Sequence, residues 1–205
     1  MAVRPDGGKS TPLWVEALEA DAPDVVACWR GFTWTAESRD ALLARLRPRV
    51  TEGSAGRFLA QQEAIGDALE SVLRSLPDEL LRAPGGEEDW NVAQAFAHTT
   101  AARRFLVTWA ALDAGGTWPD HRAPTVIPSV PGRADATREE LLVLLDKSRR
   151  SLREAAEKIA GHETQPCGLA HPFIGHLRCG DWLLFVGIHD LMHLEQLHDL
   201  RASHA

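Results

Sequence analysis

Two histidines near the C-terminal end of the chain are spaced for shared chemistry. His189 and His193 lie four residues apart in segment 181–200, DWLLFVGIHDLMHLEQLHDL, which has the periodicity of a helix. Their rings therefore leave the same helix face and can converge on one point. Gln196 follows on that face, one turn further along. Because a buried imidazole pair without partners is costly, a metal ion bound by both rings would remove that cost.

The face that carries the histidines is otherwise apolar. At spacings of three and four, the inward stripe comprises Trp182, Phe185, Val186, His189, His193, Gln196, Leu197 and Leu200. Four polar residues lie off this stripe and are expected in solvent, namely Asp190, Glu195, His198 and Asp199. The pair is written HDLMH and not HExxH, so the glutamate that serves metallopeptidases as general base is absent. Peptidase chemistry is therefore not expected.

The histidine pair needs a third ligand, because a catalytic zinc-type site uses about three protein ligands and an open position. His98 is the best candidate, since it interrupts the Ala- and Phe-rich stretch AQAFAHTTAA on a helix that can face the last one in a bundle. His98, His189 and His193 would then form a three-histidine set. The alternative is that these histidines are core residues bonded to backbone carbonyls, and HxxxH pairs also occur on exposed helices.

Other histidines and cysteines fall in segments 115–136 and 162–180, which are rich in glycine and proline. Those that could be considered as further ligands are His121, Cys167, His171, His176 and Cys179. Their spacing matches no metal signature, so we interpret them as loop residues. With Cys28 there are three cysteines and no CxxC pair, which indicates a reducing compartment and no disulfide scaffold.

Four long helices are expected to position the histidines, and no segment is a convincing strand. They are predicted from Phe58 to Leu76, from Val92 to Ala114, from Arg138 to Ile159 and from Asp181 to Leu200. Capping boxes are expected where Asn91 precedes Gln94 and where Thr137 precedes Glu140. The long segment 115–136 would let the helices on either side of it run parallel.

The first 56 residues are predicted to be a separate, partly helical extension of a bundle domain over residues 57–205. Residues 1–13 are expected to fray, and short helices are expected over 23–32 and 38–46. The extension is aromatic but too short for a core of its own. It should therefore pack on the bundle or in a dimer interface.

Composition excludes several classes of function. The chain has 205 residues, is 44% hydrophobic, and has no apolar run long enough to span a membrane. Its net charge of -7 argues against a nucleic-acid surface. The N-terminus lacks the apolar stretch of a secretory signal, so we expect a cytoplasmic protein.

Three motifs together resemble the DinB/YfiT-like superfamily. They are Trp90-Asn91 followed by a helix with a central His98, the segment HPFIG at 171–175, and HDLMHLEQ at 189–196. The resemblance covers about residues 58–200. Two features depart from it: Arg178, Cys179 and Gly180 stand where the family usually has serine or threonine, and the first 50 or so residues have no counterpart.

The resemblance implies an all-α fold, an up-down-down-up four-helix bundle that is often a homodimer. It also implies a divalent metal, zinc or nickel, held by the residues at His98, His189 and His193. Members with an assigned activity are similar to thiol transferases that activate a low-molecular-weight thiol such as bacillithiol, mycothiol or glutathione.

Three functions follow from these observations. The first is a metal-dependent S-transferase or hydrolase that acts on a small molecule, because a bound cation lowers the pKa of a coordinated thiol or water. The second is a non-catalytic protein that holds a metal or small ligand, as in a stress response. The third is a structural bundle with core histidines. Gln196 would either orient a ligand or histidine, or be a polar residue at the bundle end.

Overall fold

Helices account for almost all the regular structure of the chain, for which a computed structural model describes residues 12–85, 89–118 and 130–204. The elements are, in order, α1 (Leu13–Asp21), α2 (Pro23–Trp29), α3 (Ala36–Leu46), α4 (Ala55–Ser75), the 3-10 turn η1 (Asp78–Arg82), α5 (Val92–Ala114), α6 (Arg138–Ile159), β1 (Pro166–His171), β2 (Gly175–Arg178) and α7 (Cys179–Ser203). Within those described ranges, no helix is long and apolar enough to cross a membrane.

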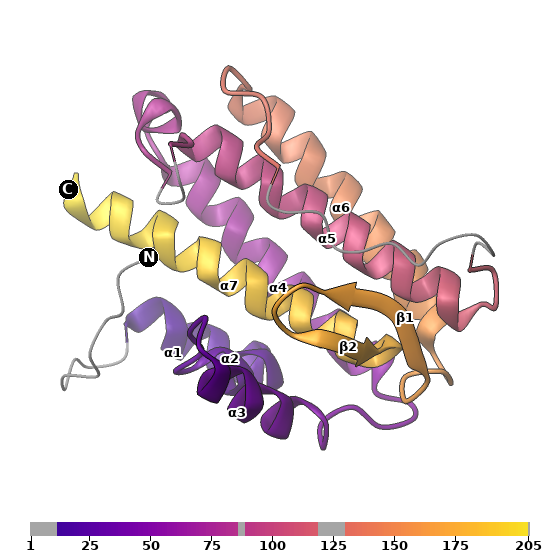
Figure 1. The fold of residues 1–205 in the computed structure, drawn as a ribbon. Helices are drawn as coiled ribbons and strands as arrows, with labels where there is room; N and C mark the ends of the chain where they lie inside the picture. The colour runs from indigo at the N-terminus through magenta and orange to yellow at the C-terminus, as the bar shows by residue number, and fades with distance from the viewer. Residues whose placement is uncertain (1–11, 86–88, 119–129, 205) are drawn as a thin grey trace.

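The long helices α4 to α7 form a bundle with the predicted up-down-down-up order. In Figure 1, α4 and α7 run in one direction, and α5 and α6 run in the other. Each of α4 and α5 packs against both α6 and α7. Because α5 and α6 are parallel, the chain must return along the bundle between them, as the long segment 115–136 indicated. Residues 119–129 of that segment, with His121, lie outside the described residues.

Both predicted capping boxes are confirmed. The Asn91 side chain accepts a hydrogen bond from the backbone N–H of Gln94 (2.9 Å), and the Gln94 side chain accepts one from Asn91 N–H (3.2 Å). Thr137 and Glu140 make the same reciprocal pair at the start of α6. These bonds satisfy N–H groups that a helix start leaves without partners, so the starts of α5 and α6 are fixed locally.

The expectation of no strand is wrong for segment 162–180. There β1 and β2 form an antiparallel hairpin, with His171 opposite Gly175. Gly175 has a φ of +84°, which glycine adopts without strain, and it closes the turn. The strands have only six and four residues, too few for a clear alternating pattern. The hairpin lies across the beginning of α7 (Figure 1).

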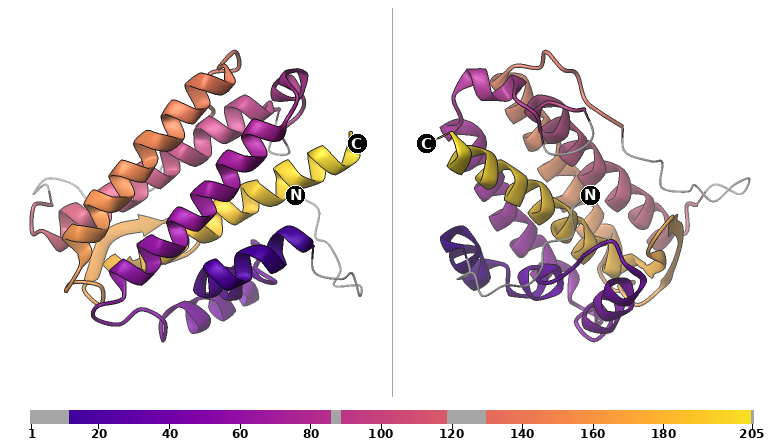
Figure 2. Two further views of the ribbon diagram at one scale, coloured as in Figure 1. Left: turned by 180° about the vertical axis from the view of Figure 1, so that it is seen from behind. Right: turned by 60° about the vertical axis from the view of Figure 1, so that its left-hand side comes forward.

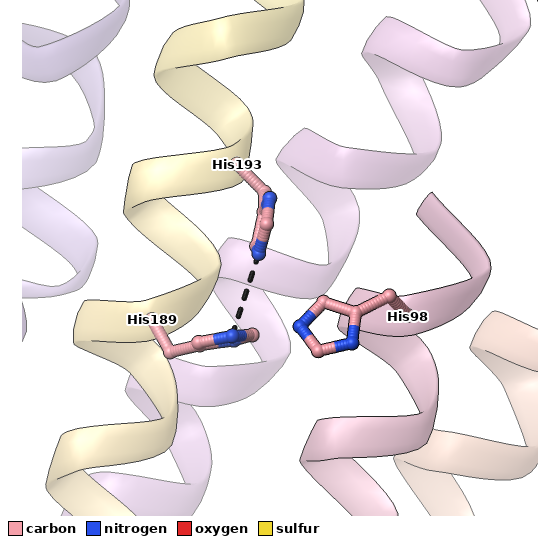
Figure 3. A group of neighbouring side chains, drawn as sticks. All are labelled: His98, His189 and His193. Carbon is pink, nitrogen blue, oxygen red and sulfur yellow. Dashed lines mark hydrogen bonds between the residues drawn. The ribbon is translucent and has the colours of Figure 1, made fainter. Parts of the chain in front are cut away.

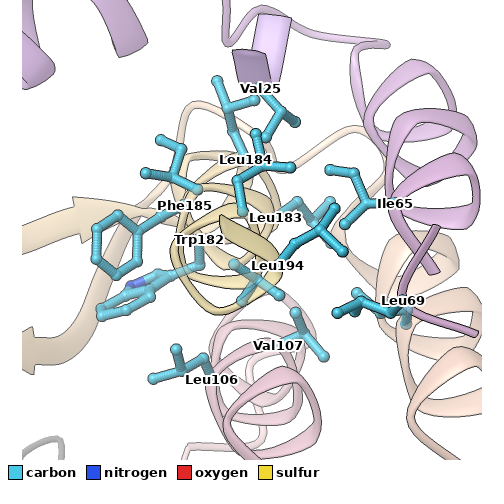
Figure 4. Close-up of a cluster of buried hydrophobic side chains, with 14 of the residues drawn as sticks. Val25, Ile65, Leu69, Leu106, Val107, Trp182, Leu183, Leu184, Phe185 and Leu194 are labelled. Carbon is cyan, nitrogen blue, oxygen red and sulfur yellow. The ribbon is translucent and has the colours of Figure 1, made fainter. Parts of the chain in front are cut away.

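The helix α7 is buried on nearly all sides, and not along one stripe as predicted. Side chains beyond the predicted stripe are fully buried, including Leu183, Leu184, Ile188, Leu191 and Leu194. Figure 4 shows α7 end-on, with apolar side chains of α2, α4 and α5 around it. The bundle covers one face of α7 and the N-terminal helix α2 covers another. An apolar run such as Trp182 to Ile188 is typical of a helix buried all round.

The N-terminal helices lie together on one side of the bundle (Figure 2). The chain forms α1 in addition to the two short helices expected, and α2 ends three residues earlier than predicted, at Trp29. The Gln61 side chain, on α4, accepts hydrogen bonds from the backbone N–H groups of Asp24 (3.0 Å) and Val25 (3.2 Å). This side chain therefore caps the start of α2 and ties it to the bundle. Residues 1–11 lie outside the described part.

Candidate metal centre

The three predicted histidines meet between α5 and α7. In Figure 3, His98 projects from α5 toward His189 and His193 on α7. One ring nitrogen from each lies within 4.8 Å of the others, so the group could hold a metal ion. The Nε2 atoms of His189 and His193 are 3.4 Å apart. The His98 ring centroid is 5.3 Å from that of His189 and 5.4 Å from that of His193.

Neighbouring acceptors fix the protonated nitrogen on two of the three rings. His98 Nδ1 lies 3.2 Å from the Val130 carbonyl oxygen, and His193 Nδ1 lies 2.9 Å from Gln196 Oε1. Because these oxygens accept hydrogen bonds, each Nδ1 carries the proton. In a neutral imidazole the other nitrogen, Nε2, then presents a lone pair. Gln196 thus lies beside His193, where it orients the ring.

The spacing of the nitrogens fits a tetrahedral metal. Two nitrogen ligands, each about 2.0–2.1 Å from a tetrahedral zinc, are about 3.3 Å apart. The 3.4 Å between Nε2 of His189 and Nε2 of His193 agrees with this separation. His189 Nδ1 is buried and forms no hydrogen bond with the described residues. The dashed line in Figure 3 marks the hydrogen bond that these two Nε2 atoms form without a metal, when His189 Nε2 carries the proton. With the proton on His189 Nδ1 instead, both Nε2 lone pairs are free to bind a cation between them.

Burial keeps the histidines neutral, the form that binds metals. It lowers the pKa of His189 and the pKa of His193 to about 3 each, with neighbouring histidines acting in the same direction. Burial also lowers the pKa of His98, against the effect of its hydrogen bond to the Val130 carbonyl. No proton therefore has to leave these rings before they bind a cation near pH 7.

The expectation that Asp190 is solvated is wrong. Asp190 and Arg103 are both fully buried, and Asp190 Oδ2 lies 3.1 Å from Arg103 Nη1. The other carboxylate oxygen lies 3.9 Å from His189 Nδ1. Burial raises the pKa of the Asp190 carboxyl to about 7, against the lowering effect of Arg103. An ion pair therefore lies directly behind the histidine group and links α5 to α7.

The sequence contained one indication of this ion pair. A helix that is apolar from Trp182 to Ile188 is buried all round, so a carboxylate two residues further along needs a cation. Nothing in the sequence selected Arg103 as that cation, since Arg104 follows it directly. The structure distinguishes them, because Arg103 is buried and Arg104 is exposed.

The other histidines, and the other polar residues expected in solvent, lie in different environments. His171, at the end of β1, accepts hydrogen bonds at Nδ1 from the N–H groups of Phe173 (3.1 Å) and Ile174 (3.2 Å), so it shapes the turn. The His198 ring stacks on Trp14 with centroids 4.9 Å apart, so it is not freely solvated as expected. Of the other two residues expected in solvent, Asp199 is exposed and Glu195 is half-buried. His176 is exposed on β2.

Comparison with known protein families agrees with this geometry. The model of the DinB superfamily matches residues 61–197, which is about two thirds of the chain. The chain belongs to the DinB superfamily. The matched range includes all three histidines, and it leaves out the N-terminal helices α1 to α3. No curated protein and no solved structure matches the chain.

In this DinB-superfamily protein, the buried histidines should make metal-free stability depend on pH. His171, His189 and His193 have folded-state pKa values of about 4, 3 and 3. Below about pH 6.5 such histidines take up protons only on unfolding, so stability falls as pH falls. Asp190 acts in the opposite direction, because burial raises its folded-state pKa to about 7. Each of these three histidines should lose about 2 kcal/mol of stabilisation between pH 7 and pH 5, and Asp190 should restore about 2 kcal/mol, so we expect a net loss of about 3–4 kcal/mol. His198, whose folded-state pKa burial lowers to about 4, acts in the same direction as the three histidines.

Urea unfolding in the presence of a chelator measures this difference. The free energy of unfolding should be lower at pH 5 than at pH 7, with a similar m-value. An equal or higher stability at pH 5 would show that the histidines are accessible to protons in the folded protein.

Proposed function

We propose that His98, His189 and His193 bind one divalent cation, zinc or nickel, and that the protein uses it in an S-transferase or hydrolase reaction on a small molecule. The observation that carries this proposal is the pair of Nε2 atoms 3.4 Å apart on neutral rings. The bound cation would supply Lewis acidity, lowering the pKa of a thiol or water so that the nucleophile exists at neutral pH.

The donor set favours an anionic nucleophile. Three neutral imidazoles leave the full 2+ charge of the cation uncompensated. With three protein ligands, one position of a tetrahedral site stays open for a thiolate or a hydroxide. A low-molecular-weight thiol is the co-substrate that the resemblance to thiol transferases implied. An electrophilic small molecule would then be the acceptor.

The protein groups around the histidines have positioning roles in this proposal. The Val130 carbonyl and Gln196 Oε1 each hold an Nδ1–H, which sets the orientation of His98 and of His193. The Asp190 carboxylate lies on the Nδ1 side of His189 and adds negative charge behind the site. These contacts let the rings keep their positions while the ligand in the open position changes.

Metal content of wild type and His193→Ala, measured side by side, tests the site. We expect His193→Ala to contain one equivalent of zinc or nickel less than wild type after identical purification without chelator. His98→Ala, on the other helix, should lose the same equivalent. His162→Ala is the matched control, because His162 is exposed in a turn outside the group. Equal metal content in wild type and both site variants would contradict the proposal.

Activity is a separate measurement. Metal-loaded wild type should consume a low-molecular-weight thiol in the presence of an electrophilic acceptor, or hydrolyse an activated ester, and His193→Ala should not. Metal binding without either activity would leave the non-catalytic binding protein as the function of the same site.

A further inference from the structure

A second group of candidate ligands lies at the opposite end of α7 from its C-terminus. Asp113 is in the last turn of α5, Cys167 is on β1, and Cys179 is the first residue of α7. One oxygen of the carboxylate and the two sulfur atoms all lie within 4.8 Å of one another. Cys179 precedes His189 by ten residues, or about 15 Å of helix, so this group is separate from the three histidines.

The group is electron-rich, and its two cysteines are buried whereas Asp113 is half-buried. Cys167 is 3% exposed and Cys179 is fully buried. A hydrogen bond to Cys179, burial and the negative charge of Asp113 all raise the pKa of the Cys167 thiol. Among the residues that the structure describes, Asp113 forms no ion pair. A carboxylate beside two buried sulfurs therefore lacks a positive partner in the described part of the chain.

Hydrogen bonds hold the carboxylate toward the hairpin. Asp113 Oδ2 accepts from the N–H of Gly168 (2.5 Å), the residue that follows Cys167. The backbone carbonyl of Asp113 accepts from Gln165 Nε2 (3.0 Å). Cys179 N–H donates to the Gln165 carbonyl oxygen (2.9 Å). The three candidate ligands are thus held by the bonds that join α5, β1 and α7, as expected of a preformed site.

We propose that Asp113, Cys167 and Cys179 form a second metal site, selective for a thiophilic divalent ion of the zinc class. On binding, each thiol releases its proton to solvent, and both sulfurs bind the cation as thiolates. Two thiolates and one carboxylate give a donor charge of 3−, so the bound site has a net charge of 1−. Soft sulfur ligands favour zinc over magnesium or calcium, and water would complete the tetrahedron.

The site would have a structural function. It joins the end of α5, the hairpin and the start of α7. The hairpin carries His171, whose ring meets that of Phe185 on α7 with centroids 5.4 Å apart. Three protein ligands and a water are the ligand pattern of a catalytic zinc site, but burial of both sulfurs hinders access by a substrate, so we assign the site a structural function. Metal loss should therefore loosen the hairpin first.

The test uses the full-length protein, kept reduced and loaded with zinc or with cobalt. Wild type should bind two equivalents of zinc, and both Cys179→Ser and His193→Ala should bind one. Cobalt-loaded wild type and His193→Ala should show the near-ultraviolet charge-transfer absorption of thiolate-bound Co(II), and Cys179→Ser should lose it. Cys28→Ser is the matched control, because Cys28 is a buried cysteine on α2 outside the group.

Asp113→Asn is a second variant, which keeps an oxygen for the Gly168 N–H but removes the charge. It should lower the zinc affinity of the Asp113–Cys167–Cys179 site at least tenfold and leave the zinc affinity of the three-histidine site unchanged. Absence of the charge-transfer band in cobalt-loaded wild type would overturn the proposal, whatever the variants do. Two zinc equivalents in a folded Cys179→Ser protein would overturn it as well. Neither result bears on the three-histidine site, which His193→Ala and His98→Ala test separately.

Discussion

Replacement of Arg103 with methionine should destabilise the protein by about 3–5 kcal/mol. Arg103 and Asp190 are both fully buried, with 3.1 Å between their charged groups, and Arg103 also donates to the Gln62 carbonyl oxygen (3.2 Å). Without the guanidinium, the carboxyl of Asp190 must stay charged and unpaired or take up a proton. Either state is costly in an apolar interior. Loss of the ion pair should also disturb the histidine group, because Asp190 is adjacent to His189 in the chain and lies 3.9 Å from its Nδ1.

Two further variants separate loss of the ion pair from loss of packing. Arg104→Met changes the adjacent, exposed arginine and should alter the free energy of unfolding by less than about 0.5 kcal/mol. The double variant Arg103→Met with Asp190→Leu removes both charges, so it should recover much of the stability that Arg103→Met loses. Urea unfolding of wild type, Arg103→Met, Asp190→Leu and the double variant measures this cycle, and Arg104→Met is unfolded beside them. If the double variant were as unstable as the sum of both single changes, the ion pair would not be the cause.

Trp182→Ala should lower the free energy of unfolding by about 3–5 kcal/mol. This loss is similar in size to that of Arg103→Met but has a different physical origin. Trp182 is fully buried near the start of α7, and its ring meets Phe185 edge-on with centroids 5.8 Å apart (Figure 4). Its Nε1 forms no hydrogen bond with the described residues, so the loss comes from burial and packing. Removing the indole leaves a cavity where α7 meets the surrounding helices.

Trp109→Ala is the matched control for that cavity. Trp109 is on α5 and is only half-buried. The same change there removes less buried apolar area, so it should lower the free energy of unfolding by less than Trp182→Ala does. Thermal or urea unfolding followed by circular dichroism compares the two. Trp182→Phe, which keeps an aromatic ring, should lie between wild type and Trp182→Ala. Equal effects at positions 109 and 182 would mean that burial does not set the cost.

Local sequence determined the helical framework. The capping boxes at Asn91 and Thr137 depend on residues three positions apart, so they were predicted and are present. The period of the apolar residues predicted all four long helices, and the length of segment 115–136 predicted the parallel pair. The spacing of His189 and His193 likewise followed from helix geometry alone. His98 was added because a histidine in an alanine-rich helix is unusual, and the structure brings it to the other two.

Only the tertiary structure decided which polar groups are buried and paired. Asp190 looked solvated because helical periodicity identifies one inward face, and it cannot show that Asp190 meets Arg103 of α5 on a second buried face. The ion pair with Arg103 joins residues far apart in the chain, as do the contacts of Asp113 with the hairpin. Likewise, the Val130 carbonyl fixes the His98 proton from a distant segment. Such contacts depend on how helices pack, and spacing along a single helix contains no information about them.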